Sequence, residues 1–424
     1  MSETQKFSKL PFILITSLFL VWGLSNNMTD ILLAAFKRIM SMTDFQTSWI
    51  QVAFYGSYFC LAIPAALFIK RYTYKSGVLL GLGLFILGSL LFYPASISMQ
   101  YGHFLSALFI LAGGLAILET TANPYIIAMG PEESATRRLN LAQSFNPIGS
   151  IIGILLGKVY ILSHLNSASA EERASMDSEK LDIIQSEELN AVMGPYVAVA
   201  IMLILLWVLI YFVKMSKASD ASQDFNIIPA VKRLVKNKDY LAGIVAQFFY
   251  VGAQIGVWSF TIRYVMNELQ LNEEQASSYY LASLILFMVS RFVCTALMKF
   301  FRPNILLALL SFIAILATFC VIYFGGLVGV YALVLISGCM SLMYPTIYGL
   351  AISGLRNDTK IASSGLVMAI LGGAVLTPLQ GLVSDIAESI NYAFYVPLFS
   401  FLVVFLYAVS ISKKIKRGEQ TQSY

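Results

Sequence analysis

Residues 11–36 read PFILITSLFLVWGLSNNMTDILLAAF, an apolar run interrupted by amides and one carboxylate. The run exceeds the roughly 20 residues that a helix needs to cross the hydrocarbon core of a bilayer. Asp30 lies inside it, and Asn26 and Asn27 share its face because residues three and four apart are neighbours on a helix. A charge near the bilayer centre costs about 2.5–3.5 kcal/mol, so such residues usually mark an ion or substrate pathway.

The composition of the whole chain indicates a membrane protein with many spans. Of its 424 residues 58% are hydrophobic and only 12% are charged, and the mean hydropathy is +0.75. A soluble globular domain carries about twice that share of charge. The formal charge of +5 follows the pattern of membrane topology and does not indicate nucleic-acid binding.

Neither a cleaved leader nor a metal or disulfide framework is expected. The first apolar run lacks a small-residue cleavage site, so we interpret it as a retained helix. The four cysteines all fall inside apolar runs, without CxxC or metal-ligand spacing, and are interpreted as packing residues. They are Cys60, Cys294, Cys320 and Cys339.

Apolar runs separated by short polar turns predict an all-α membrane protein with twelve transmembrane helices. The predicted spans are 10–36, 45–69, 76–96, 101–129, 138–163, 195–214, 240–267, 275–299, 304–324, 328–354, 361–386 and 391–412. Six spans, a basic connector and six more spans predict two six-helix halves with a transport path between them. The expected boundaries are an N-terminal half at 1–214, a cytoplasmic linker at 215–239 and a C-terminal half at 240–424.

The distribution of lysine and arginine predicts the orientation, because cytoplasmic loops retain positive charge. Placing both termini inside leaves only four basic residues in outer loops, namely Lys37, Arg38, Arg173 and Lys180. Most of the others fall in inner loops, including six around the central connector. Both termini and the connector are therefore expected on the cytoplasmic side.

Further polar residues of the first half follow helical spacing. Glu119 and Asn123 are four apart in the fourth span, and Gln143 and Asn146 are three apart in the fifth. A single buried amide is most often a helix–helix hydrogen bond. Several amides beside two acids favour the alternative, that these helices direct polar faces toward a substrate pathway.

The seventh span carries the clearest polar stripe of the second half. Gln247, Tyr250, Gln254 and Trp258 are spaced by three, four and four residues. Aromatic faces and amides that both donate and accept suit a sugar, although the stripe could also be core packing. Tyr344 of the tenth span is expected to contribute to the far wall of the same site, with Tyr348, Thr377 and Gln380 as further candidates.

Asp30 and Glu119 are the candidate proton carriers. The two histidines, His103 and His164, fall near outer helix ends, so a deep histidine relay is not available. Burial favours the neutral form of a carboxyl group, which would let it bind a proton near neutral pH. A sodium site with oxygen ligands remains an alternative, as does a structural ion pair with Arg263 or Arg291.

Glycines and prolines predict packing faces and helix bends. Gly149, Gly153 and Gly157 recur every fourth residue of the fifth span, the spacing of a close helix–helix contact. Prolines inside the spans predict kinks; they are Pro64, Pro124, Pro147, Pro345 and Pro378. Arg291 is interpreted as an anchor for a helix end.

Five motifs stand out in the chain: NNMTDIL at 26–32, LETTANP at 118–124, LNLAQSFN at 139–146, YVGAQ at 250–254 and YPT at 344–346. Together they resemble the L-fucose:proton symporter family of the major facilitator superfamily. The resemblance covers nearly the whole chain and implies the major facilitator fold. It also implies proton coupling through Asp30 and Glu119, and sugar contacts from Asn27, Gln143, Asn146 and Tyr344.

Three features depart from the pattern. The turn after the second span reads Lys70-Arg71-Tyr72 in place of the superfamily's glycine-rich turn with Asp and Arg. Pro147 follows the fifth-span amides, and Lys158 adds a charge. The conformational lock at that turn is therefore expected to be built differently, and the sugar could differ from L-fucose.

The sequence therefore predicts a monomeric sugar:proton symporter of the bacterial inner membrane, with L-fucose as the expected sugar. Its expected partners are the sugar, the proton and the lipid bilayer, without nucleic acid, metal or cofactor beyond the coupling ion. Uptake of galactose, glucose or N-acetylglucosamine, with sodium as a possible coupling ion, is the alternative. A non-transporting sugar sensor is a minor alternative, and an enzyme is not expected because no nucleophile or metal cluster is evident.

Overall fold

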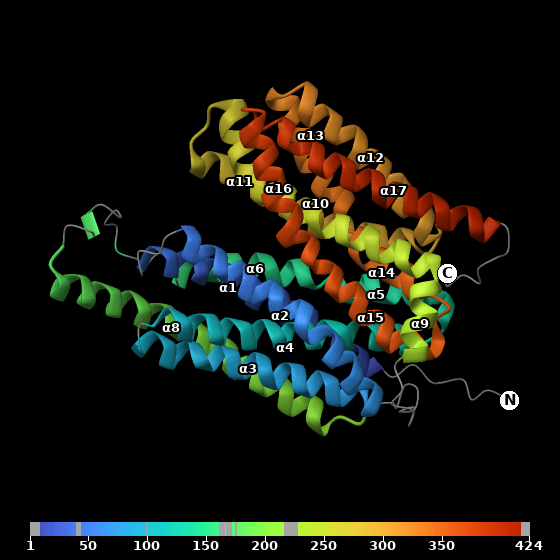
Figure 1. Cartoon of the computed structure of the whole chain (residues 1–424), viewed down its shortest axis with the longest axis horizontal. Coiled ribbons are helices and arrows are strands. Elements are labelled where there is room, and N and C mark those ends of the chain that lie inside the picture. The colour runs from blue at the N-terminus through green and yellow to red at the C-terminus, as the bar shows by residue number, and fades with distance from the viewer. Residues whose placement is uncertain are drawn as a thin grey trace. The chain divides into compact units, whose positions relative to one another are not determined.

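The computed structural model describes residues 9–39, 44–98, 100–160, 166, 172–173, 176–215 and 228–416. Every regular element within these residues is helical. Within these residues twelve stretches, each made of one or more helices, are long and apolar enough to cross a membrane. In lipid each backbone N–H and C=O must find its partner inside the segment, and a helix achieves this locally. The predicted all-α, twelve-span architecture is confirmed (Figure 1).

The helices form two compact units, the N-unit and the C-unit. The N-unit contains Lys9–Ala122 and the chain from Phe145 to the end of α8. Its helices are α1 (Lys9–Ile39), α2 (Asp44–Arg71), α3 (Tyr74–Ser98), most of α4 (Tyr101–Ala128), α6 (Asn146–Tyr160) and α8 (Ser178–Phe212). Within it α1 packs along α6, and α3 packs along α8.

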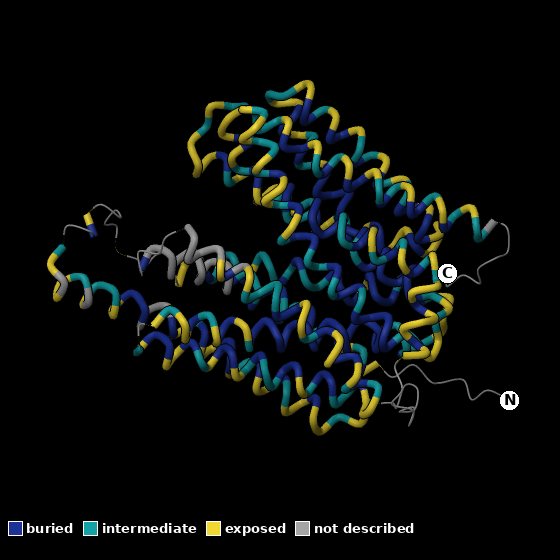
Figure 2. The backbone as a smooth tube through the Cα atoms, in the orientation of Figure 1, coloured by how far each residue is buried: buried dark blue, intermediate teal, exposed yellow. Residues whose placement is uncertain are grey.

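The C-unit contains Asn123–Ser144 and the chain from α9 onward. Its elements are η1 (Glu132–Ser134), α5 (Ala135–Gln143), α9 (Ile228–Lys236), α10 (Lys238–Leu269), α11 (Glu273–Leu297), α12 (Pro303–Tyr323), α13 (Gly326–Met340), α14 (Met343–Ile352), η3 (Arg356–Asp358), α15 (Thr359–Met368), η4 (Ala369–Leu371), α16 (Gly372–Ile386), η5 (Tyr392–Phe394) and α17 (Tyr395–Lys416). Helix α10 contacts α14, α16 and α17, and α12 lies between α13 and α17. Figure 2 shows the buried positions of this unit where its helices face one another. The division into six-helix halves at 215–239 stays a prediction.

Two of the predicted kinks coincide with interruptions of the helical backbone. In the fifth span α5 ends at Gln143 and α6 begins at Asn146, while in the tenth α13 ends at Met340 and α14 begins at Met343. Pro147 and Pro345 lie in the first turns of the helices that follow. Proline lacks the N–H that a helix interior needs but fits the first turn, where that donor would be unpaired. Helices α2, α4 and α16 instead continue through their prolines.

Close packing of α1 on α6 confirms the predicted glycine face. A methyl group added at Gly149 would lie 1.9 Å from the carbonyl oxygen of Leu20. One added at Gly153 would lie 2.3 Å from the carbonyl oxygen of Leu24. The backbones of α1 and α6 thus approach as closely as glycine allows, and Gly149 and Gly153 stabilise this contact through shape.

Gly149→Ala is expected to destabilise the protein, because the new methyl group meets backbone atoms that cannot rotate away. Overpacking of this kind typically costs about 1–3 kcal/mol. Gly56→Ala in α2 is the matched control, since nothing lies within 4 Å of the added group there. Thermal unfolding of both variants in detergent tests the prediction. Equal melting temperatures for the two would contradict it.

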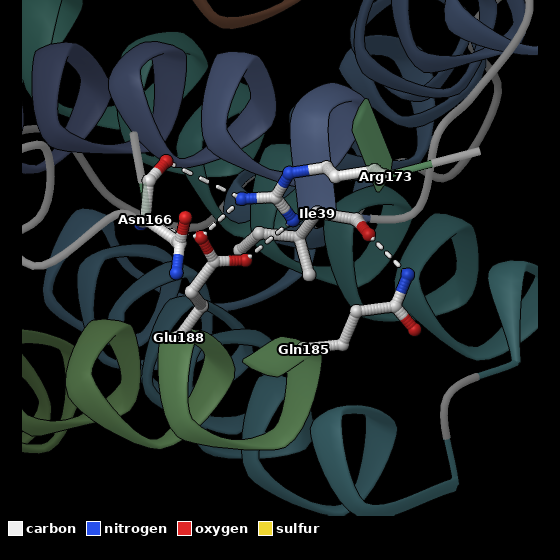
Figure 3. A network of polar contacts seen from close by, with 5 residues as sticks. All are labelled: Ile39, Asn166, Arg173, Gln185 and Glu188. Carbon is white, nitrogen blue, oxygen red and sulfur yellow. Dashed lines mark hydrogen bonds and ion pairs between the residues drawn. The ribbon is translucent and has the colours of Figure 1, made fainter. Parts of the chain in front are cut away.

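Within the N-unit, polar contacts join Asn166 and Arg173 to α8, and α8 to the end of α1 (Figure 3). The Arg173 guanidinium donates to both carboxylate oxygens of Glu188, and both side chains are almost fully buried. The backbone N–H of Asn166 donates to the same carboxylate at 2.6 Å. Gln185 Nε2 donates to the carbonyl oxygen of Ile39, the last residue of α1. The hydrogen bond to Glu188 raises the pKa of Arg173. The ion pair connects Arg173 to α8.

Candidate functional site

Two predicted site residues form a buried amide pair within the C-unit. Gln143 Nε2 donates to Asn123 Oδ1 at 2.9 Å, and both side chains are buried. Asn123 Nδ2 has no hydrogen-bond partner among the described residues. An unpaired buried donor costs about 1–3 kcal/mol. The structure therefore brings two predicted site residues together and leaves one donor available to a ligand.

Arg291 of α11 binds the backbone at both interrupted spans. Its Nε donates to the carbonyl oxygen of Ser341, and Nη1 donates to that of Gln143 at 3.1 Å. The last carbonyls of a helix lack intrahelical partners and carry partial negative charge, which a buried cation complements. The guanidinium also lies 4.5 Å from the centroid of the Phe287 ring.

Arg291 therefore binds the carbonyl ends of two helices, and both ends lie at interruptions inside spans and not at the inner end of a span. Among the described side chains Arg291 contacts carbonyl oxygens and an aromatic ring but no carboxylate. Its side chain is only 4% exposed, so the charge is fully enclosed by protein. Sequence reasoning did not connect Arg291 with Gln143. A buried arginine together with two proline-marked interruptions was the signal that could have suggested the link.

Two further hydrogen bonds tie α5 to other parts of the C-unit. Asn140 Nδ2 donates to Thr346 Oγ1 at 3.2 Å, and the hydroxyl groups of Ser144 and Thr295 are 3.4 Å apart. All four side chains are buried. Asn140 and Thr346 lie outside the predicted set of sugar ligands, and their mutual bond supports a packing role.

In the polar stripe of α10, two side chains form hydrogen bonds with other helices and two do not, within the residues that the structure describes. Tyr250 Oη donates to the carbonyl oxygen of Met340 at 2.9 Å, and Trp258 Nε1 donates to Ser337 Oγ at 3.3 Å. Neither amide atom of the fully buried Gln247 has a partner in the described part of the chain. Gln254 is half-buried. Gln247 and Gln254 are thus the stripe residues whose hydrogen-bonding capacity remains open.

Aromatic rings line up beside this stripe. The half-buried Tyr344 ring lies 6.4 Å from that of Tyr250 and 6.5 Å from that of Tyr348, centroid to centroid. The second pair is stacked with an interplanar angle of 27°. Tyr250 and Tyr348 are fully buried, so the half-buried Tyr344 is the ring of this group that offers a flat apolar face to a ligand. Gln380 is fully buried with both amide atoms unpartnered among the described residues.

The predicted residues of the N-unit lie on α1, α4 and α6. Asn27 Nδ2 donates to the Gly23 carbonyl oxygen at 2.9 Å in its own helix. Asn146 Nδ2 donates to the Phe19 carbonyl oxygen at 3.2 Å and so joins α6 to α1. Asn26 is half-buried, and its Oδ1 has no partner among the described residues.

Of the two candidate proton carriers, the structure describes the side chain of Glu119 but not that of Asp30. Glu119 lies in α4 and is only 3% exposed, in agreement with a buried carboxyl group. Asp30 lies in α1, but its side chain is outside the described part of the structure. Within the described residues no group of His, Cys, Asp and Glu has the arrangement of a metal site.

Comparison with known proteins places this arrangement in a family. The family model of the Major Facilitator Superfamily matches residues 13–370. L-fucose-proton symporters of Haemophilus influenzae and Escherichia coli are each 40% identical, over 96% and 94% of this chain and 97% and 92% of their own lengths. The chain belongs to the L-fucose:proton symporter family.

The solved structure of one family member, FucP in the outward conformation, has a TM-score of 0.90 and 38% identity to this chain. It covers 95% of this chain and 99% of its own. A glucose/galactose transporter of Brucella abortus is more distant, with 31% identity over 97% of both chains. These relatives are transporters, so this member of the symporter family is a multi-pass membrane transporter and not an enzyme.

Proposed function

We propose that this chain takes up L-fucose together with a proton across the bacterial inner membrane, with both termini in the cytoplasm. The observation that carries the proposal is the full-length match to two L-fucose-proton symporters at 40% identity. The glucose/galactose transporters match over similar lengths at only 31–32%. Alternating access of a monomer, with no cofactor besides the coupling ion, is the corresponding mechanism.

Chemistry within the C-unit supports a sugar as the substrate. A sugar presents hydroxyl groups that both donate and accept, and C–H faces that pack on aromatic rings. Asn123 Nδ2 and the Gln247 amide supply unfilled donors and acceptors, and Tyr344 supplies a half-buried ring. Tyr250 and Trp258 are assigned to shaping this wall, because their polar atoms already bind α13.

The N-unit contributes the proposed proton carriers and further amides. Asn26 Oδ1 is an unfilled acceptor, while Asn27 and Asn146 each donate one amide hydrogen to α1 and keep their carbonyl oxygens for a ligand. Glu119, with Asp30, is assigned proton binding on one side of the membrane and release on the other. A protonated carboxyl is neutral, so carrying it through a buried site avoids most of the cost of a charge.

Uptake of labelled sugar into proteoliposomes tests the proposal. With an inwardly directed proton gradient and no sodium, L-fucose is expected to accumulate, and unlabelled L-fucose should compete better than galactose, glucose or N-acetylglucosamine. Collapse of the gradient by a protonophore should return the sugar to its external concentration. A requirement for sodium would contradict proton coupling, and stronger competition by glucose would contradict the assignment of the sugar.

A further inference from the structure

The short helix α9 has three distinct faces. Ala230 and Leu234 are buried, and α9 packs against α10 and α15. Ile228, Val231 and Val235 are 59%, 42% and 59% exposed. Their spacing of three and four residues places them on one side of the helix. Residues 228, 231 and 235 therefore form an exposed apolar strip along α9.

Cations flank the apolar strip. At 100° per residue, Lys232 and Lys236 fall between the strip and the position of Arg233. Both lysines are exposed and form no ion pair within the described residues. An apolar strip beside a lysine-rich face is the pattern of a helix that lies in the plane of a membrane interface.

The helix is held in place by an ion pair of Arg233, which leaves Lys232 and Lys236 free. Arg233 binds both carboxylate oxygens of Asp358 in η3, at 2.7 and 2.8 Å. One residue after α9, Asn237 caps α10 by accepting from the N–H groups of Asp239 and Tyr240. Lys414 of α17 pairs with Asp239. Helix α9 therefore has a defined position at the ends of the spanning helices of the C-unit.

Exposed aliphatic residues also occur at the start of α10, the spanning helix that follows α9. Leu241 and Val245, in the first turns of α10, are 37% and 48% exposed. A spanning helix with exposed aliphatic residues faces lipid. Because α9 packs against α10, the lipid beside α10 can also cover the apolar strip of α9.

We propose that α9 lies in the bilayer interface and binds anionic phospholipid headgroups through Lys232 and Lys236. The strip of Ile228, Val231 and Val235 inserts at the boundary between headgroups and acyl chains. The ion pair between Arg233 and Asp358 fixes the orientation of the helix, so the two lysines meet the headgroup phosphates. Anionic lipid is the chosen occupant because the unpaired charge of the surface is entirely positive.

A fluorophore at Val235→Cys, in a Cys60→Ser background that removes the exposed thiol, tests the proposal in the full-length protein. Proteoliposomes containing brominated phosphatidylglycerol or brominated phosphatidylcholine report which lipid approaches the label. Phosphatidylglycerol is expected to quench at lower mole fraction, by about fivefold for each lysine, since a lysine near an anionic surface contributes about 1 kcal/mol. High salt should reduce this preference.

The charge contribution is isolated by combining Lys232→Gln with Lys236→Gln. Both positions are exposed, so folding should be unaffected, and the quenching ratio of the two lipids should approach one. A label at Phe324→Cys, an exposed apolar position after α12, is the control and should be quenched equally by both lipids. Equal quenching at position 235 in the parent, or quenching there only by aqueous iodide, would overturn the proposal. Protection from both lipid and iodide would indicate a second copy on this face and would also overturn it.

Discussion

Glu119→Gln is expected to abolish sugar accumulation while leaving sugar exchange intact. The amide has nearly the shape of the carboxyl group, so the buried position in α4 remains filled, but it cannot bind and release a proton. A membrane potential of 100 mV contributes about 2.3 kcal/mol for each charge moved, which corresponds to about 50-fold accumulation. The variant should reach a ratio of about one, measured as labelled L-fucose inside and outside proteoliposomes.

Exchange of labelled for unlabelled sugar without a gradient is the internal control for Glu119→Gln. Exchange requires binding and the conformational cycle but no net proton movement, so it should persist. Glu119→Asp keeps a carboxyl group and should retain part of the accumulation. Asp30→Asn, measured in the same way, tests the second acid separately. Full accumulation by Glu119→Gln would contradict its coupling role.

Arg291→Met is expected to reduce the rate of uptake strongly with little change in stability. The substitution removes two charge-assisted hydrogen bonds, worth about 1.5–3 kcal/mol each. It also removes the cost of enclosing a guanidinium, which is several kcal/mol. These two contributions to the free energy of unfolding are of similar size and opposite sign. The melting temperature in detergent should therefore change little.

Transport should respond differently, because Arg291 positions the carbonyl ends of two helices. Gln143 lies at one of these ends, and Tyr344 follows the other by three residues. A displacement of about 1 Å in positioned groups can cost about 100-fold in rate, so at least about a tenfold loss of uptake is expected. Arg291→Lys keeps the charge but not the planar fork, and should be intermediate. Unchanged uptake by Arg291→Met would contradict the positioning role.

The fold could be predicted from local properties of the chain. A helix satisfies its own backbone within one turn, so apolar length and turn spacing are enough to locate each span. The same locality explains why glycine spacing indicated the close contact at Gly149, and why Pro147 and Pro345 indicated the interruptions before them. The division of the packed helices into two units depends on contacts between distant segments, which no local pattern contains.

For the candidate site, the sequence could predict which helix faces are polar. It could not predict which side chains form hydrogen bonds with one another. Helical spacing placed Glu119, Asn123, Gln143 and the α10 stripe on polar faces. It could not show that Gln143 donates to Asn123 or that Tyr250 binds the carbonyl of Met340. Those bonds consume some hydrogen-bonding groups and leave others, such as the Gln247 amide, open.

The amino-acid sequence by itself determined that this chain is a twelve-helix membrane transporter with acids and amides on its spanning helices. Tertiary structure decided which polar atoms are already bound and which remain for a ligand. The reason is that these hydrogen bonds join residues far apart in the sequence. Arg291 shows this most clearly, because it binds the carbonyl oxygen of Gln143, which is 148 residues earlier in the chain. Its enclosed charge is tolerated only where two helix ends meet it, and that meeting is a property of the packed chain.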